Sequence, residues 1–106
     1  MTARQYNPPH PGEVLFGLDM QPAGLTIKKV AEQIGVDRKT ISRIVNGHAS
    51  ITAEMAILLG KAFKTTPELW LNMQRNYDLW HAEQRMKQRL SKIKPFAQNF
   101  SEINPV

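Results

Sequence analysis

A run of hydrogen-bond donors near residue 40 is the part of the chain whose side chains best suit binding chemistry. The donors are Arg38, Lys39, Thr40, Ser42 and Arg43. Arginine and lysine can pair with guanine O6 and N7, and threonine and serine suit base edges or phosphates. An exposed helix that carries these groups fits the major groove of DNA. We therefore predict that these five residues read base pairs, with Ser42 the weakest candidate.

Two short helices would have to position this basic face. Their apolar residues recur at helical spacing and are Ile27, Val30, Ala31 and Ile34, followed by Ile41, Ile44 and Val45. Thr26 and Asp37 can cap the two helices, and Gly35 suits the turn between them. The pattern is typical of a helix-turn-helix. A structural hairpin with a solvated basic face is the alternative, and the short glycine turn together with the polar face disfavours it.

Residues at the ends of the two helices suit the phosphate backbone. Thr26 and Lys28 begin the first helix, where free amides and the helix dipole favour an anion. Asn46 and His48 follow the second helix and would reach the backbone beyond it. We predict phosphate contacts for these four residues.

The composition is that of one small basic domain. The 106 residues carry a net charge of +5, which suits an anionic partner, although solubility alone could also account for it. The positive charge gathers at residues 26–50 and again at residues 81–95. There is no cysteine for a disulfide or a cysteine-ligated zinc, no apolar run of about 20 residues and no signal-peptide pattern. We expect a cytoplasmic protein without membrane contact.

Together with the remaining patterns, these two helices predict an all-α fold of five helices with a long C-terminal helix. The sequence HPGE at residues 10–13 opens a short first helix, for which Val14, Leu15 and Leu18 form the inward face. A fourth helix is predicted over about residues 53–63 after Thr52, and a fifth from Thr66 to about residue 89. We expect a flexible arm at residues 1–10, the domain at 11–90 and an irregular tail at 91–106.

Large side chains recur along the predicted fifth helix. Trp70, Met73, Tyr77 and Trp80 step by three, four and three residues, which resembles a coiled-coil stripe. Such a stripe packs in a core, forms a surface between two copies of the chain, or does both with different residues. One short reading helix makes few base contacts, whereas a two-fold dimer reads two half-sites. We predict a homodimer with these four residues at its interface.

Several motifs together resemble one family of regulators. The segment VAEQIGVDRKTISRIVNG resembles the helix-turn-helix of phage-repressor-like proteins. The order of HPGEVL, SRIVNG, TPELWLNMQRNYDLW and KPF, over roughly residues 8–97, is similar to the HigA family of antitoxins. The resemblance implies the antitoxin of a type II toxin–antitoxin module, which neutralises a HigB-like messenger-RNA interferase by direct binding and represses its own operon as a dimer. Ile27 departs from the wider class, in which a glutamine often braces the first base contact.

Other functions fit the sequence less well. A solitary transcriptional regulator without a toxin is the main alternative. For a basic toxin, the N-terminal arm or first helix with Glu13 and Asp19 is a better surface than the basic segment 85–94. An enzyme is disfavoured because His10, His48 and His81 are scattered along the chain, and Asp78 with His81 makes only a two-residue metal pair. We expect no cofactor and no metal.

Overall fold

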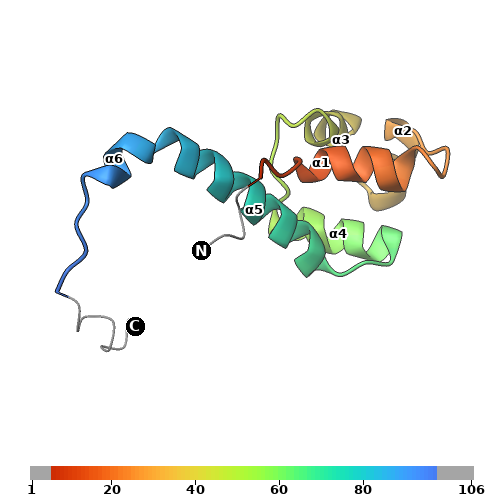
Figure 1. The fold of residues 1–106 in the computed structure, drawn as a ribbon. Coiled ribbons are helices and arrows are strands. Elements are labelled where there is room, and N and C mark those ends of the chain that lie inside the picture. The colour runs from red at the N-terminus through yellow and green to blue at the C-terminus, as the bar shows by residue number, and fades with distance from the viewer. Residues whose placement is uncertain (1–5, 98–106) are drawn as a thin grey trace.

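The computed structural model describes residues 6–97, which form helices joined by short turns (Figure 1). The elements are α1 (Pro11–Val14), the π-helix η1 (Leu15–Met20), α2 (Ile27–Ile34), α3 (Arg38–Val45), α4 (Ala53–Phe63), α5 (Pro67–Arg85) and α6 (Lys87–Ser91). No strand occurs in this part of the chain. The predicted all-α class is confirmed, with α1 and η1 together forming the first helix.

The predicted capping residues begin the helices. Side-chain oxygens of Thr26, Asp37, Thr52 and Thr66 accept hydrogen bonds from the backbone amides of Lys29, Lys39, Met55 and Leu69, at 2.9–3.2 Å. Gly35 ends α2 with a φ of 75°, a conformation that glycine adopts without steric penalty. Local side-chain chemistry therefore fixes where α2 to α5 start.

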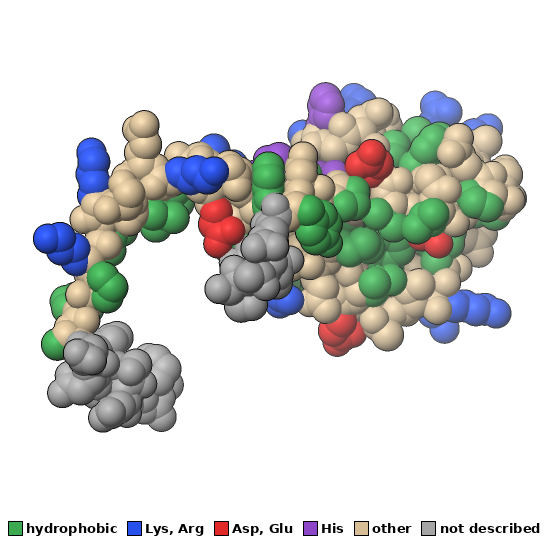
Figure 2. Space-filling view, in the orientation of Figure 1, with side chains coloured by type: hydrophobic (Ala, Val, Ile, Leu, Met, Phe, Trp, Pro, Cys, Tyr) green, Lys and Arg blue, Asp and Glu red, His purple; other side chains and the backbone are tan. Residues whose placement is uncertain are grey.

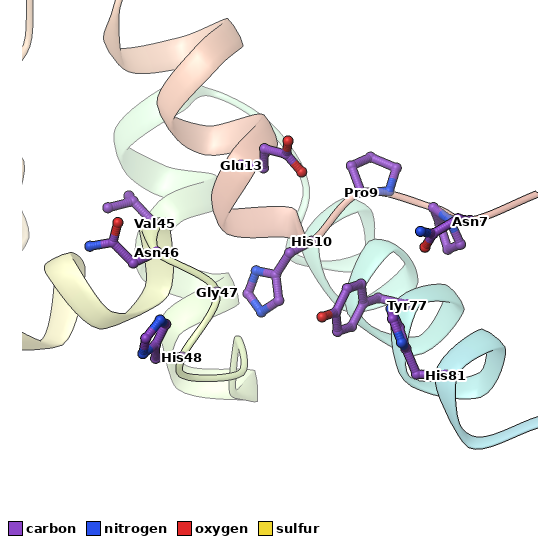
Figure 3. Close-up of a pocket in the computed structure, with 11 residues that line it drawn as sticks. Asn7, Pro9, His10, Glu13, Val45, Asn46, Gly47, His48, Tyr77 and His81 are labelled. Carbon is purple, nitrogen blue, oxygen red and sulfur yellow. The ribbon is translucent and has the colours of Figure 1, made fainter. Parts of the chain in front are cut away.

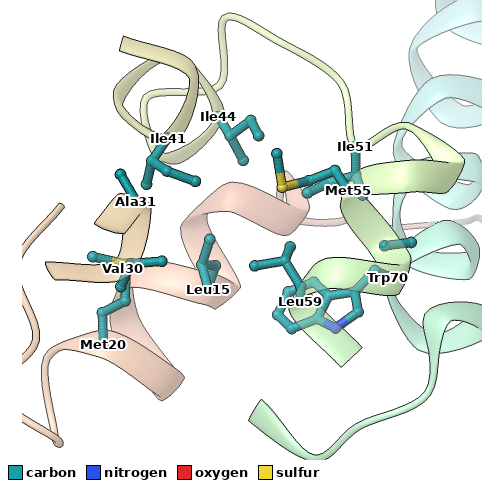
Figure 4. Packing of buried hydrophobic residues seen from close by; sticks show 11 residues of the cluster. Leu15, Met20, Val30, Ala31, Ile41, Ile44, Ile51, Met55, Leu59 and Trp70 are labelled. Atoms are coloured by element: carbon teal, nitrogen blue, oxygen red, sulfur yellow. The ribbon is translucent and has the colours of Figure 1, made fainter. Parts of the chain in front are cut away.

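One hydrophobic core holds these helices together (Figure 4). Leu15 of η1 lies between the side chains of α2 and α3 and those of α4. The fully buried residues of the core include Leu15, Met20, Ile41, Ile44, Leu59 and Trp70. Because α3 contributes Ile41 and Ile44, its orientation on the domain is fixed by burial.

The π-helix changes which residues of the first helix point inward. The Gln21 amide donates to the Phe16 carbonyl and the Leu25 amide to the Met20 carbonyl, both at 2.9 Å and both across five residues. This wider turn buries Leu15 and Met20 and leaves Leu18 71% exposed. The prediction of Leu18 on the inward face is wrong, because it assumed the spacing of an α-helix.

The C-terminal helix is long but interrupted. It was predicted to run to about residue 89, whereas α5 ends at Arg85 and Met86 separates it from α6. The first part of α5 packs on α4, and the rest projects away from the domain with α6 (Figure 1). We call the projecting part of α5 together with α6 the stem. α5 therefore belongs to the core at its start and to the stem at its end.

The packed part of the chain begins earlier than predicted. Pro8 and His10 are buried, although both were assigned to a flexible arm at residues 1–10. The His10 side chain caps α1, which orders the chain up to that point. The start of the predicted arm, residues 1–5, and the end of the predicted tail, residues 98–106, lie outside the described residues.

Candidate nucleic-acid interface

The predicted reading residues lie on the outward side of α3. Arg38, Lys39, Thr40 and Arg43 are exposed, and Ser42 is half-buried. The opposite side of the helix carries the buried Ile41 and Ile44, so rotation of α3 would expose the core. The structure thus presents a donor-rich helix face to solvent in a fixed orientation.

Two shallow recesses flank α3. One, of about 400 Å³, lies between the starts of α2 and α3 and is lined by Ile27, Lys28, Asp37, Arg38, Lys39 and Ser42. The other, of about 360 Å³, lies between α3 and the start of α4, and its lining includes Lys39, Thr40 and Arg43. The fold therefore brings Lys28 next to Arg38 and Lys39 and leaves room on both sides of the reading helix.

The predicted phosphate residues fall at the two ends of this surface. Thr26 and Lys28 are exposed at the start of α2, and Asn46 and His48 are exposed after α3. The Thr26 side-chain oxygen already accepts from the Lys29 amide at 3.1 Å, so its hydroxyl proton is what it can offer to a phosphate. The Asn46 side-chain amide donates to the Ser42 carbonyl at 2.8 Å and caps α3.

Arg43 has a contact that the sequence did not reveal. Its Nη2 donates to the His48 carbonyl oxygen at 3.0 Å. The guanidinium therefore closes the loop that follows α3 while lying on the exposed face. Arginine has further donors, which remain available to a base or phosphate.

The histidines that are scattered in the sequence line one open recess of about 760 Å³ (Figure 3). The Tyr77 ring lies 4.9 Å from the His10 ring and 4.2 Å from the His81 ring, measured between centroids. Asp78 accepts from the Gln74 side-chain amide at 2.9 Å. Within residues 6–97 no group of three or more histidine, cysteine or acidic side chains could hold a metal.

The aromatic stripe of α5 divides between the core and the stem. Trp70 is fully buried, and its indole Nε1 donates to Thr65 Oγ1 at 2.8 Å. The prediction of a dimer surface is wrong for Trp70, because the core of the same chain already covers its ring. Met73 also packs against the core, whereas Tyr77 and Trp80 are half-buried.

Gln74 is a buried residue that the sequence analysis missed. Its Oε1 accepts from the Ile51 amide at 2.8 Å, which ties α5 to the loop after α3. The only signal for it was a polar residue on the inward side of the helix between Trp70 and Tyr77.

The first helix exposes an apolar and acidic surface. Phe16 is 39% and Leu18 71% exposed, close in sequence to Glu13 and Asp19. Figure 2 shows hydrophobic side chains gathered over this part of the molecule with acidic side chains among them. Burial raises the pKa of Asp19. Among the described helices none is long and apolar enough to cross a membrane.

Comparisons with known proteins agree with this geometry. A helix-turn-helix family matches residues 19–70. An uncharacterised helix-turn-helix transcriptional regulator of Haemophilus influenzae is 45% identical over 79% of this chain and 80% of its own length. Antitoxin HigA-1 of Vibrio cholerae is 39% identical over 90% of each chain. The solved structure of Pseudomonas aeruginosa antitoxin HigA with the higBA promoter has a TM-score of 0.82 and 31% identity, and covers 85% of this chain and 99% of that one.

Proposed function

The chain belongs to the HigA family of helix-turn-helix antitoxins, and from this premise we propose that it represses its own operon by binding operator DNA through α3. The family consists of non-enzymatic DNA-binding regulators. The observation that carries the proposal is the exposed basic face of α3, held outward by Ile41 and Ile44. The solved HigA relative is bound to promoter DNA, and nearly its whole chain superposes on 85% of this one.

In this arrangement α3 enters the major groove. The diameter of an α-helix with its side chains, about 10–12 Å, fits a groove about 12 Å wide. Arg38, Lys39 and Thr40 in the first turn, with Arg43 and more weakly Ser42, read bases. Thr26 and Lys28 hold one phosphate backbone, and Asn46 and His48 hold the other. The two pairs of phosphate residues lie toward opposite ends of α3, which supports their assignment to different backbones.

Arg43→Ala is expected to lose about 1–3 kcal/mol of operator binding and to relax the preference at one base pair. The loss combines a base contact with the brace to the His48 carbonyl. Titration against a panel of single-base operator variants measures it. Arg75→Ala, which removes an exposed arginine on α5, is the control and should bind as the unmodified chain does. An equal loss on every duplex would make Arg43 a phosphate contact or a purely structural brace.

We further propose that the protein binds DNA as a homodimer through the projecting stem. Leu79, Met86 and Leu90 are exposed along the stem, and Trp80 is half-buried beside them. A second copy would cover these residues, with Met73 and Tyr77 at the edge next to the core. Sedimentation equilibrium should give twice the chain mass, and a footprint should cover two half-sites about one helical turn apart. A chain that remains monomeric when bound to one half-site would contradict this.

The family membership supports a second binding partner, a HigB-like messenger-RNA interferase toxin that the protein neutralises by direct contact. We place the toxin on the first helix, where Phe16, Leu18 and Glu13 are exposed and Asp19 is half-buried. Apolar area with acidic groups suits a basic ribonuclease. Both activities belong in the cytoplasm, where the operator and messenger RNA are found.

Leu18→Lys is expected to weaken the toxin complex by about tenfold or more, because it places a cation where a basic partner docks. Co-purification and calorimetry with the product of the neighbouring reading frame measure the complex. Ile57→Lys is the matched control, since Ile57 is similarly exposed but lies on α4. Unchanged toxin binding by the Leu18 variant would move the interface elsewhere.

A footprint on the DNA upstream of the gene, with and without the neighbouring gene product, tests the function as a whole. Protection of that DNA supports autorepression, and its absence contradicts it. Protection without any co-purifying neighbour would favour a solitary regulator, which the DNA-binding geometry supports equally well.

A further inference from the structure

The first half of the loop between α3 and α4 is held by α3 itself. The Gly47 amide donates to the Ile44 carbonyl at 3.0 Å. The His48 amide donates to the Arg43 carbonyl at 2.8 Å, and the Arg43 guanidinium donates back to the His48 carbonyl at 3.0 Å. Asn46 and His48, the proposed phosphate contacts beyond the reading helix, both lie in this half of the loop.

The second half of the loop is held by α5. Ile51 closes the loop, and its side chain is buried in the core (Figure 4). Its backbone amide donates to Gln74 Oε1 at 2.8 Å. Gln74 is only 6% exposed, so removal of this oxygen would leave a buried N–H without its acceptor. Two residues separate His48 from Ile51, so the position of Ile51 limits where His48 can lie.

Asp78 determines which end of the Gln74 amide faces the loop. Gln74 Nε2 donates to Asp78 Oδ1 at 2.9 Å, four residues further along α5. A side-chain amide has an oxygen that accepts on one side and an NH2 group that donates on the other. An ionised carboxylate only accepts, so it binds the NH2 group and leaves the oxygen for the Ile51 amide. These two hydrogen bonds therefore connect the exposed Asp78 to the buried end of the loop.

We propose that Gln74 and Asp78 are positioning residues for DNA binding. They hold the loop after α3 so that Asn46 and His48 contact the phosphate backbone. The inference rests on the proposed operator binding and adds two residues of α5 to it. Neither residue suits a direct DNA contact, because Gln74 is buried and the Asp78 carboxylate has the charge that phosphate repels. Their effect on DNA binding passes through the loop.

Two substitutions at Asp78 separate this role from the effect of charge. Asp78→Ala and Asp78→Asn remove the same negative charge, but asparagine keeps an oxygen that can accept from Gln74. Charge alone would make both variants bind DNA more tightly and to the same extent. We expect instead that Asp78→Ala binds about fivefold more weakly than Asp78→Asn, the size of one hydrogen bond. Asp78 is exposed, so both variants should remain folded by circular dichroism.

The same pair of variants shows whether the effect passes through the loop. Because the loop contacts phosphates, the fivefold difference should be equal on the operator and on a scrambled duplex. His48→Ala removes a side chain through which the loop contacts the backbone. In a His48→Ala background the two Asp78 variants should therefore bind DNA more nearly alike. A difference of unchanged size in that background would contradict a route through the loop.

A further measurement needs no DNA. In the free protein, hydrogen exchange of the Ile51 amide should be about fivefold faster in Asp78→Ala than in Asp78→Asn. The Met55 amide, which donates to the Thr52 hydroxyl at 3.2 Å, is the control and should exchange alike in both variants.

Equal DNA affinity of the two Asp78 variants would overturn the proposal and leave operator binding intact. An unmodified chain that binds no upstream DNA would instead refute operator binding. The exchange of the Ile51 amide would then still decide whether Asp78 and Gln74 hold the loop.

Discussion

Gly12→Ala is expected to destabilise the protein by at least about 3 kcal/mol, a large share of the roughly 5–15 kcal/mol that stabilises a domain. A Cβ atom on Gly12 would overlap the Ile44 carbonyl oxygen and lie 3.0 Å from the Val45 Cα atom. Both belong to the backbone of α3, so no side-chain rotation relieves the overlap. α1 would have to move away from the reading helix.

Urea unfolding followed by circular dichroism measures the effect of Gly12→Ala. Gly17→Ala is the matched control, because apart from its chain neighbours and the backbone of its own helix no heavy atom lies within 4 Å of the corresponding Cβ position. Alanine in that helical position should leave stability unchanged or raise it by about 0.5–1 kcal/mol. If both variants unfolded at the same urea concentration, the close approach of α1 to α3 would be disproved.

The double variant Arg38→Ala, Lys39→Ala is expected to lose about 2–5 kcal/mol of operator binding, because good base contacts contribute about 1–3 kcal/mol each. Both side chains are exposed in the first turn of α3, so circular dichroism and the unfolding midpoint should not change. Anisotropy titrations with the operator and with a scrambled duplex of equal length give the loss and its sequence dependence. The loss should be much larger on the operator.

Lys28→Ala provides the comparison for that result. Lys28 lies at the start of α2, in the recess it shares with Arg38 and Lys39. As a phosphate contact it should weaken binding to both duplexes alike and reduce the salt dependence by about one unit. The assignment of bases and phosphates would be reversed if Lys28→Ala discriminated between duplexes and the double variant did not.

Local signals made much of the fold predictable. A capping oxygen bonds an amide two or three residues away, so Thr26, Asp37, Thr52 and Thr66 give helix starts without knowledge of the fold. Leu18 could not be placed in the same way, because the π-turn changes the spacing of the inward face. Trp70 was ambiguous because a periodic stripe shows that a surface is covered, but not whether the same chain covers it.

The candidate interface was predictable to a similar degree. The apolar residues of α3 lie on one side of the helix and are buried. The opposite side must then face solvent, so the exposed face could be predicted from the sequence. The role of Gln74 was not predictable, because the Ile51 amide that it binds lies 23 residues away in sequence. Only the tertiary fold brings such distant residues together.

The division of α5 between core and stem has a consequence for how the helix opens. Amides near Trp70 and Gln74 lie against the core and should exchange with solvent deuterium only through global unfolding. Those from Leu79 onward belong to the projecting part of the helix, where residues 80–83 are half-buried and the rest are exposed, and in a single chain they should exchange through local fraying. In the proposed dimer a second copy covers these turns. Their exchange should therefore slow as protein concentration rises, while that of the core amides stays constant. In a lone chain the same frayed turns would be the first sites that a protease reaches.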